Sequence, residues 1–257
     1  GFEPMTVISA PRTRAYVKIE DGCECFCTYC AIPRARGEVR SKKPEDVLAE
    51  VEGLARRGTG EVVLTGIETA SYGADLPDIR LIDLLERLEK ESIVPRIRLG
   101  SLTPAVLTED FVTRLRVLKK PAPHFHLSIQ SGSDGVLRRM ARRYRAQEER
   151  DAIARLRAAL PEAELTCDVM VGFPGETEEE FRETEAFCRE ADFLSMHVFA
   201  YSPRAGTAAA RMKGQVPEPV KHARSATLIA LAAEMHAGRL RRRLEACAPL
   251  RVLFETE

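Results

Sequence analysis

The sequence has no tryptophan, and aromatic residues make up only 6% of its 257 positions. It also has no net charge, because 39 basic side chains balance 39 acidic ones. A uniformly basic coat for nucleic acid is therefore excluded, and any basic surface must be local. No apolar run approaches the roughly 20 residues of a membrane helix, and no basic-then-apolar leader opens the chain. We expect a cytoplasmic protein, in which thiols stay reduced.

The remaining composition is that of a folded domain. Hydrophobic residues account for 44% and charged residues for 30%, which does not indicate disorder. The length suits one large α/β domain or two small ones, and it is close to the roughly 250 residues of an eight-unit barrel.

Four of the seven cysteines are crowded into one short loop. Cys23, Cys27 and Cys30 form a C-x3-C-x2-C pattern, whose spacing allows three thiolates to converge on one corner of an inorganic cluster. A four-iron cube held in this way has one iron without a protein ligand, and that iron can bind a small molecule and pass it an electron. Cys25 also permits a C-x-C-x-C reading, and we treat it as a non-ligand.

Two other uses of these cysteines compete with the cluster. A structural zinc site usually needs two cysteine pairs, and no second pair is present. The remaining cysteines stand alone in strand-like or helix-like segments, where a cysteine is most often a small buried hydrophobe: Cys167, Cys188 and Cys247. A disulfide framework is disfavoured because the chain is long enough to build a core without one. The zinc alternative stays open.

Strand-like and helix-like segments alternate about six times after a linker at residues 1–13. The predicted strands cover residues 14–19, 61–65, 96–99, 124–129, 165–171 and 193–200. Helices are predicted from Pro44, around 82–88, from Thr108 through Leu118, from the fourth strand's loop to about Leu160, from Thr177, and through Leu240. This alternation predicts parallel strands with right-handed crossovers, as in a barrel or a doubly wound sheet. Residues 250–254 read as the start of one more strand.

Every predicted strand is followed by a glycine-rich or polar loop. Because the carboxyl ends of parallel strands meet at one edge, these loops should form a single mouth that includes the cysteine loop. Six units would leave a barrel incomplete, so that a large substrate could enter from the side.

The motifs, taken in order, resemble the radical S-adenosylmethionine (SAM) superfamily, and within it the methylthiotransferases. They are Asp21-Gly22-Cys23 with Cys27–Cys30, Arg36-Gly37, His126 with Gln130–Ser133, Gly172–Thr177 and Tyr201–Thr207. The resemblance implies an α/β fold, a partial (β/α)6 TIM-like barrel of parallel strands. It also implies a 4Fe–4S cluster on Cys23, Cys27 and Cys30, with SAM bound to the open iron. Reductive cleavage of SAM would give a 5′-deoxyadenosyl radical that abstracts hydrogen from the substrate.

The finer resemblance is to enzymes that methylthiolate C2 of N6-threonylcarbamoyladenosine at position 37 of tRNA. Residues 64–73 and 96–104 carry it. The branch specific for isopentenyladenosine usually has a Gly-Gln-Asn-type sequence at Ile67-Glu68-Thr69, and the branch that modifies a ribosomal-protein aspartate is less similar there. A different radical SAM reaction and a non-enzymatic zinc or RNA-binding domain are the alternatives.

Members of this family have further domains. Residues 1–13 would then be a linker from an N-terminal domain, 14–247 the radical SAM domain, and 248–257 the start of a C-terminal TRAM-like β domain. The auxiliary 4Fe–4S cluster of the family is expected only in the full-length protein. The implied partners are tRNA and a reduced flavodoxin- or ferredoxin-type electron donor, and the sequence does not indicate the oligomeric state.

The resemblance also implies a set of SAM contacts at or near the strand ends. They are Tyr29 beside the adenine, Glu68 and Thr69 at the amino end, Ser101, Gln130, Ser131 and Asp168 at the ribose or methionine part, and Arg204 at a carboxylate or phosphate. Packing, solvated loops, interior hydrogen bonds and a rim salt bridge are the competing explanations. His124 and His126 share one face of a strand but have no third ligand nearby in sequence, so interior packing is favoured for them.

Two arginine-rich groups predict a local phosphate-binding surface for tRNA. One follows the fourth strand on a predicted helical segment: Arg138, Arg139, Arg142, Arg143 and Arg145. The other flanks the cysteine loop: Arg34, Arg36, Arg40, Lys42 and Lys43. A third group, Arg239 with Arg241–Arg243, is interpreted as a solvated helix end.

Overall fold

The computed structural model describes residues 6–7, 13–247, 249 and 252–254. Its centre is a set of six parallel strands: β1 (Arg14–Lys18), β4 (Glu61–Thr65), β5 (Ile97–Leu99), β6 (His124–Gln130), β7 (Glu164–Val171) and β8 (Ser195–Ala200). They form two parallel sheets, β1-β4-β5 and β6-β7-β8. Parallel bridges from Ile97 to Pro121 and from Leu102 to Leu127 join them. The described part of the chain shows no pairing of β1 with β8, so the six strands form an open arc, as the sequence predicts.

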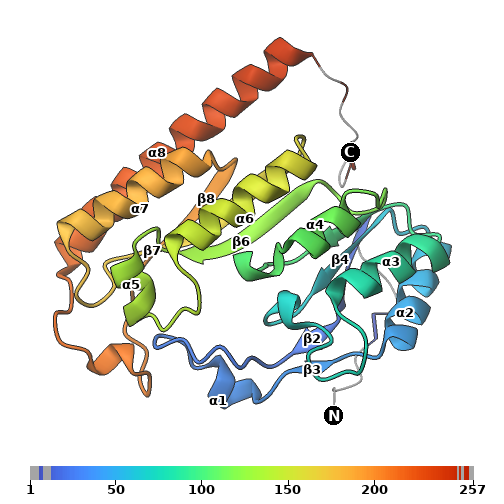
Figure 1. Cartoon of the computed structure of the whole chain (residues 1–257), viewed down its shortest axis with the longest axis horizontal. Coiled ribbons are helices and arrows are strands. Elements are labelled where there is room, and N and C mark those ends of the chain that lie inside the picture. The colour runs from blue at the N-terminus through green and yellow to red at the C-terminus, as the bar shows by residue number, and fades with distance from the viewer. Residues whose placement is uncertain (1–5, 8–12, 248, 250–251, 255–257) are drawn as a thin grey trace.

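Helices return the chain from each strand to the next and cover the outer side of the arc (Figure 1). They are α2 (Pro44–Arg56), α3 (Leu81–Glu91), α4 (Glu109–Leu115), α5 (Asp134–Arg139), α6 (Ala146–Ala159), α7 (Glu178–Ala191) and the long α8 (Glu218–Ala246). Short elements follow β1: the antiparallel pair β2 (Glu20–Asp21) and β3 (Arg40–Ser41), with α1 (Ile32–Arg36) between them. Single 3-10 turns follow β4 (η1, Thr69–Ser71), β5 (η2, Pro104–Val106) and β8 (η3, Ala209–Arg211). No described helix, α8 included, is long and apolar enough to span a membrane.

The two faces of the strands differ in chemistry because side chains alternate along a strand. On β6, Phe125, Leu127 and Ile129 are buried in the core, whereas His126 and Ser128 lie on the opposite face and are only half-buried. The apolar face therefore packs under the helices, and the inner face of the arc is polar.

Predicted helix starts agree with the structure. Thr108 caps α4 by accepting a hydrogen bond from the Phe111 backbone N–H (3.2 Å). Thr177 and Glu180 form a reciprocal capping box at the start of α7. Pro44 opens α2 with Glu45 and Asp46 in the first turn, where the helix dipole favours acidic groups.

Two predicted elements are wrong. The helix expected from the fourth strand's loop to Leu160 is broken into α5 and α6, and Ala141 in the break has a left-handed φ of 58°. Within the break, Tyr144 turns inward and donates its hydroxyl to the Ser128 carbonyl (2.8 Å) at the end of β6. Arg142, Arg143 and Arg145 are therefore not on a helix.

Of the predicted final strand, positions 250 and 251 lie outside the described residues, and residues 252–254 form no strand. The proposed domain boundaries stay a prediction.

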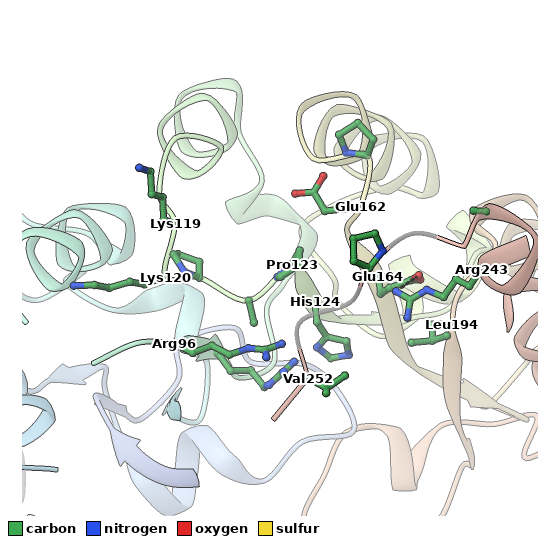
Figure 2. Close-up of a pocket in the computed structure, with 16 residues that line it drawn as sticks. Arg96, Lys119, Lys120, Pro123, His124, Glu162, Glu164, Leu194, Arg243 and Val252 are labelled. Atoms are coloured by element: carbon green, nitrogen blue, oxygen red, sulfur yellow. Dashed lines mark ion pairs between the residues drawn. The ribbon is translucent and has the colours of Figure 1, made fainter. Parts of the chain in front are cut away.

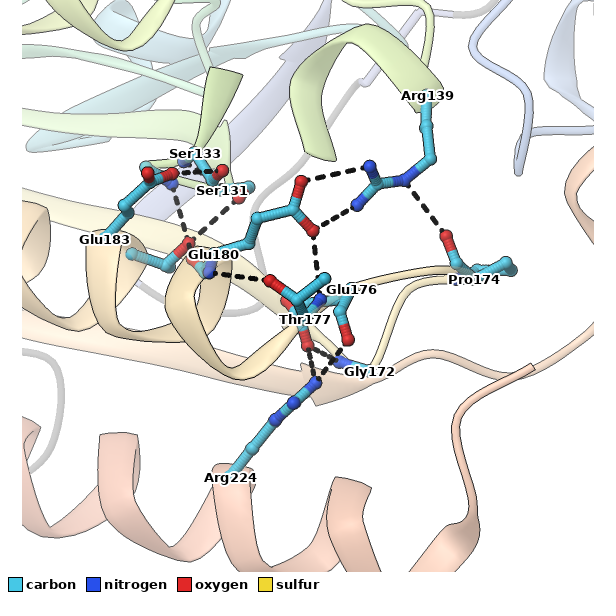
Figure 3. Close-up of polar contacts among 12 residues, drawn as sticks. Ser131, Ser133, Arg139, Gly172, Pro174, Glu176, Thr177, Glu180, Glu183 and Arg224 are labelled. Carbon is cyan, nitrogen blue, oxygen red and sulfur yellow. Dashed lines mark hydrogen bonds and ion pairs between the residues drawn. The ribbon is translucent and has the colours of Figure 1, made fainter. Parts of the chain in front are cut away.

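The loop between β7 and α7 is a junction of four elements (Figure 3). The Glu176 carboxylate accepts from the Gly172 N–H (2.6 Å) and from Arg224 of α8 (2.6 Å). Glu180 of α7 binds Arg139 of α5 through two hydrogen bonds of 3.0 and 2.6 Å. The Gly-Phe-Pro-Gly-Glu-Thr motif thus fixes how α5, α7 and α8 meet at the end of β7.

Replacing Gly132 by alanine should destabilise the fold. A Cβ at this position would lie 2.4 Å from the Cβ of Phe187 in α7, and such overpacking costs roughly 1–3 kcal/mol. Urea unfolding of the Gly132→Ala chain should show a lower midpoint with an unchanged slope.

Gly53→Ala is the matched control. Gly53 lies inside α2, and the nearest atom to its added Cβ is a flexible Arg57 side-chain nitrogen at 3.4 Å. This variant should gain up to about 1 kcal/mol from helix propensity. Equal urea midpoints for Gly132→Ala and the unchanged chain would contradict the close packing of Gly132, in the loop after β6, against Phe187.

Candidate active site at the carboxyl ends of the strands

The cysteine loop leaves β2 through a turn that only glycine can make. Gly22 has φ +92°, and a Cβ there would lie 1.9 Å from the Glu38 carbonyl oxygen. Next to it, the buried Asp21 carboxylate faces Lys18 (2.8 Å), Arg40 (3.4 Å) and Arg36 (3.7 Å). Burial acts to raise the pKa of Asp21, but the hydrogen bond and charge of Lys18, with the Arg36 charge, bring it below its usual value. The base of the loop is therefore held by an ionised carboxylate.

The tip of the loop is held against segments distant in sequence. Thr28 donates its N–H to the Met140 carbonyl (3.0 Å) and its hydroxyl to the Arg139 carbonyl (2.8 Å). Its own carbonyl accepts from the Ala209 N–H (2.9 Å) in η3. In Figure 1 the blue segment after β2 accordingly crosses the lower edge of the arc toward α5. The loop lies across the carboxyl ends of the strands, where the sequence predicts it.

Each cysteine of the C-x3-C-x2-C pattern receives one N–H hydrogen bond at sulfur. Cys23 Sγ accepts from the Cys25 backbone N–H (3.5 Å), Cys27 Sγ from Arg142 (3.4 Å), and Cys30 Sγ from the Ile32 backbone N–H (3.4 Å). Such donors stabilise thiolate charge and are among the contacts that tune iron–sulfur sites.

Cys25 serves the neighbouring Cys23. Its thiol hydrogen bond is the main reason that the pKa of Cys23 falls to about 6, against the opposing effect of burial; Arg142 and Arg143 lower that pKa further. The same hydrogen bond, together with burial, raises the pKa of Cys25. Cys25 thus acts as a hydrogen-bond donor to the Cys23 sulfur.

The spacing of the thiols bears on the zinc alternative. Zn–S bonds of 2.3 Å place two sulfurs about 3.8 Å apart in a tetrahedral site. In the described part of the chain, the sulfurs of Cys23, Cys27 and Cys30 do not all lie within 4.8 Å of one another. Wider spacing fits ligands of a multi-iron cluster better than ligands of a single ion.

Two carboxyl groups come close enough to Cys23 for its charge to raise their pKa values: Glu20, which is fully buried, and Glu68, which is half-buried. Glu20 is fully buried and accepts from the Glu68 N–H (2.8 Å), and burial raises its pKa to about 8. Burial also raises the pKa of Glu68 to about 7; the Arg142 charge opposes this and the Cys23 charge adds to it. The Glu68 carboxylate accepts from the Thr103 hydroxyl (3.4 Å). The loop after β4 thus presents an acidic group next to the cysteines, where a ligand ammonium group could pair with it.

Arg142 contacts a cysteine sulfur of the loop through its guanidinium, and its side chain is half-buried. Besides Cys27, it donates to the Ser128 carbonyl (2.9 Å) and to the Tyr144 hydroxyl (2.6 Å), over whose ring it lies at 4.7 Å. Arg139 is occupied by Glu180 and by the Pro174 carbonyl (3.1 Å). The sequence could not separate these two from their exposed neighbours, because charge clustering says nothing about which side chains turn inward.

Of the other members of the predicted phosphate surface, Lys42 is buried in an ion pair with Glu50 and Arg40 is half-buried, and the rest are exposed. Arg34, Arg36, Arg138 and Arg143 all have exposed side chains. Arg143 also donates to the Glu24 carbonyl (2.7 Å) on the cysteine loop, and Arg34 donates to the Gly206 carbonyl. These arginines come from both sides of the cysteine loop.

Aromatic packing joins three of the loops. Tyr29 meets Phe173 edge to face with ring centroids 6.2 Å apart, and Phe173 meets Tyr201 in the same way at 5.2 Å. Tyr29 thereby anchors the cysteine loop to the loops after β7 and β8. Its predicted place beside an adenine stays a prediction.

Arg204, on the loop after β8, is exposed, and its positive charge acts to lower the pKa of Cys30.

The predicted SAM contacts fall into two groups. Gln130 ends β6 with a left-handed φ of 70°, and Ser101 is exposed just after β5. Ser131 and Thr69 are buried: the Ser131 hydroxyl lies 3.0 Å from the Thr184 hydroxyl of α7 (Figure 3), and the Thr69 hydroxyl has no hydrogen-bond partner among the described residues. Ser131 therefore connects β6 to α7 and does not face an open space.

A group of residues that the sequence reading left unconnected meets on the inner face. Asp168 of β7 accepts from His126 Nε2 of β6 (3.1 Å) and from His197 Nδ1 of β8 (3.2 Å). His126 was paired in sequence only with His124. The signal that could have found His197 is its position on the same face of a neighbouring strand, directly opposite Asp168 in the register.

The opposite end of the strands carries a cleft of about 550 Å³ (Figure 2). Its lining includes Arg96, His124 and Glu164 at the amino ends of the strands. The charges there are paired: the fully buried Glu61 binds Arg14, Arg96 and Arg98 at 2.6 to 3.0 Å. In barrels of this type the amino ends of the strands serve stability, so we place the active site at the cysteine loop.

Comparison with known proteins finds similar sequences. The chain is 47% identical over 225 residues to the threonylcarbamoyladenosine tRNA methylthiotransferase MtaB of Bacillus subtilis, an alignment that covers 87% of this chain and 50% of that protein. It is 43% identical over 246 residues to the tRNA-2-methylthio-N(6)-dimethylallyladenosine synthase of the same organism, covering 93% of this chain and 47% of that protein. The chain thus spans about half the length of these curated relatives.

Solved structures share the fold at low sequence identity. The radical SAM methyltransferase TsrM of Kitasatospora setae superposes with a TM-score of 0.62 at 18% identity, covering 76% of this chain and 38% of that one. Coproporphyrinogen III oxidase of Escherichia coli gives a TM-score of 0.62 at 17% identity, covering 87% of this chain and 53% of that one. Residues 17–188, more than half of the chain, match the sequence profile of the radical SAM superfamily. The chain therefore belongs to the radical SAM superfamily.

Proposed function

We propose that this chain is the radical SAM core of a tRNA methylthiotransferase, acting on C2 of N6-threonylcarbamoyladenosine at position 37. The observation that carries the proposal is the cysteine loop, in which the three cysteines of the C-x3-C-x2-C pattern lie at the strand ends and each sulfur accepts one N–H hydrogen bond. The relatives of known name support the choice of tRNA as substrate.

Cys23, Cys27 and Cys30 would hold a 4Fe–4S cluster, and SAM would bind beside it. The donor set fits: there are three thiols, each with an N–H donor at sulfur, and their sulfurs do not all lie within 4.8 Å of one another. When bound, the cluster supplies the electron that cleaves SAM. Glu68 would pair with the ammonium group of SAM, because its buried carboxylate lies beside Cys23 and Arg142. Arg142 would offset the negative charge of the thiolates.

The choice between the two tRNA substrates rests on the chemistry of the inner face. A threonylcarbamoyl group is polar and carries a carboxylate, whereas a dimethylallyl group is apolar. The inner face of β6–β8 carries His126, Asp168 and His197, and Arg204 is exposed on the loop that follows β8. A polar modification suits these surroundings better, which favours threonylcarbamoyladenosine over the dimethylallyl alternative.

Sulfur transfer would also need parts of the full-length protein. We propose that an auxiliary 4Fe–4S cluster on a further domain, a reduced flavodoxin or ferredoxin as electron donor, and a cytoplasmic location complete the system. For this chain we propose that the exposed Arg34, Arg36, Arg138 and Arg143 contact tRNA phosphates. Arg139 and Arg142 are left out of that surface because both are half-buried, with their guanidinium groups on Glu180 and Cys27.

The ligand set predicts the outcome of cysteine replacement. Anaerobic reconstitution with iron and sulfide should give a brown chain with about four irons. Cys23→Ser, Cys27→Ser and Cys30→Ser should each lose most of this iron, whereas Cys25→Ser should keep it, since Cys25 only donates to Cys23. Iron and sulfide analysis checks this. Equal loss in Cys25→Ser would show that the ligand set is wrong, and a colourless protein holding zinc would refute the enzyme proposal.

The reduced, reconstituted chain should release 5′-deoxyadenosine from SAM. Glu68→Gln should weaken SAM binding by roughly 10- to 150-fold, because a charge-assisted hydrogen bond is worth roughly 1.5–3 kcal/mol. Chromatography of the products and equilibrium dialysis with labelled SAM measure the two effects. Glu45→Gln, at an exposed position on α2, is the control and should bind SAM normally. Unchanged affinity in Glu68→Gln would remove this residue from the SAM site.

Charge reversal tests the tRNA surface. Two variants are compared: the double variant Arg34→Glu/Arg36→Glu, and the single variant Arg138→Glu. Each should weaken tRNA binding and lower the slope of log affinity against log salt by roughly one for each lost phosphate contact. Filter binding at several salt concentrations gives this slope. Arg56→Glu, on α2 and 72% exposed at its side chain, is the control. If the double variant and Arg138→Glu both kept the slope of the unchanged chain, these arginines would not contact tRNA.

A further inference from the structure

We propose that the inner face of β6, β7 and β8 binds a divalent transition-metal ion through His126 Nε2, the Asp168 carboxylate and His197 Nδ1. This site is separate from the cysteine loop, and the proposal does not depend on the function proposed above. Each ligand comes from a different strand, and the three strands are neighbours in one parallel sheet.

The distances between the ligand atoms are those of ligands around a common ion. Bonds of about 2.0–2.1 Å place neighbouring ligand atoms roughly 2.9–3.4 Å apart, for angles between octahedral and tetrahedral values. The Asp168 oxygen lies 3.1 Å from His126 Nε2 and 3.2 Å from His197 Nδ1. All three atoms lie within 4.8 Å of one another. Small side-chain rotations would close the remaining gap between the two imidazoles.

The strands hold these residues together through backbone register. Asp168 is directly opposite His197 in the β7–β8 pairing, and His126 is opposite Thr166, two residues before Asp168 on the same face. Adjacent strands are only about 4.8 Å apart. The grouping is therefore built into the sheet and does not depend on a mobile loop.

The second ring nitrogen of His126 is also fixed. Its Nδ1 lies 2.8 Å from the Thr166 hydroxyl, which in turn lies 3.4 Å from His124 Nε2. With Nδ1 hydrogen-bonded to Thr166, the Nε2 atom is aimed at Asp168. Metal-binding histidines usually have such a partner at the other nitrogen, and it orients the ring.

The ligand types define the class of metal. Two imidazoles and one carboxylate, without thiolate, suit Fe²⁺, Co²⁺, Ni²⁺ or Zn²⁺ rather than Cu⁺. Three protein ligands leave at least one coordination position open. The His197 side chain is 61% exposed, compared with 15% for His126. The open position would therefore face the interior of the arc, where an oxygen or nitrogen atom of a small ligand could occupy it.

The test uses Co²⁺ binding in a chain without competing thiols. Cys23, Cys25, Cys27, Cys30 and the exposed Cys247 are replaced by serine in an untagged protein, which leaves only the buried Cys167 and Cys188, and folding is checked by circular dichroism. Equilibrium dialysis should then find about one Co²⁺ per chain, with the weak visible absorption of nitrogen and oxygen ligands. His126→Ala, Asp168→Asn and His197→Ala should each abolish this binding. Thr166→Val should weaken it by about 10- to 100-fold, as expected for an orienting partner.

His222→Ala is the matched control, because His222 is an exposed histidine on α8 outside the group. It should leave Co²⁺ binding unchanged. No bound Co²⁺ in the parent chain, or equal binding in the His197→Ala chain, would overturn the proposal and leave a network of hydrogen bonds only. If the serine variant does not fold, the same variants are compared in the wild-type chain after iron–sulfur reconstitution. Bound Mn²⁺ is then counted by electron paramagnetic resonance, with the same criteria.

Discussion

The guanidinium of Arg142 is the contact on which the arrangement of the mouth depends. It joins the Cys27 sulfur, the Ser128 carbonyl at the end of β6 and the Tyr144 hydroxyl. A half-buried cation needs several acceptors to offset its desolvation. Satisfying these acceptors requires the chain to leave the helix after α5, which explains the break between α5 and α6. The same break brings the Arg139 and Met140 carbonyls to Thr28, so the position of the cysteine loop and the break in the helix have one cause.

The acidic groups at the mouth complement this cation. The Glu68 charge raises the pKa of the neighbouring Glu20 carboxyl group, in addition to the larger effect of burial. Two neighbouring carboxylates in a low dielectric do not both ionise readily. The pKa of about 8 for Glu20 and about 7 for Glu68 keeps much of the pair neutral near pH 7. An incoming ammonium group would favour the ionised form of Glu68, while Glu20 keeps its backbone contact with the same loop. Binding of a cationic ligand is thus coupled to the charge of a buried group.

Much of this fold could be predicted from the sequence because it rests on local rules. Strand and helix periods, the Thr108 and Thr177 caps and the cysteine spacing all act over a few residues. What failed depends on contacts between distant segments. Ser131 was predicted to contact a ligand, but its hydroxyl contacts the Thr184 hydroxyl of α7. The neighbouring Gly132 has no side chain, which leaves the space that Phe187 of α7 fills. The sequence did not single out His197, because the register between strands, which places it opposite Asp168, is not visible in one strand's sequence.

The two ends of the strands differ in how completely their charged side chains are paired within the chain. At the amino ends, Glu61 is fully buried but meets three arginines, and Glu164 meets Arg239 and Arg243, so these ions are paired within the chain. Charges paired in this way fix the strands and have little capacity for a ligand. At the carboxyl ends the balance is different: Glu68 and the cysteine thiols are brought together by burial with Arg142 as their shared cation. Negative groups held close together with too few internal cations favour binding of an external cation, either an iron cluster or a ligand ammonium group. The chemistry is therefore expected where the chain leaves its charges incompletely paired.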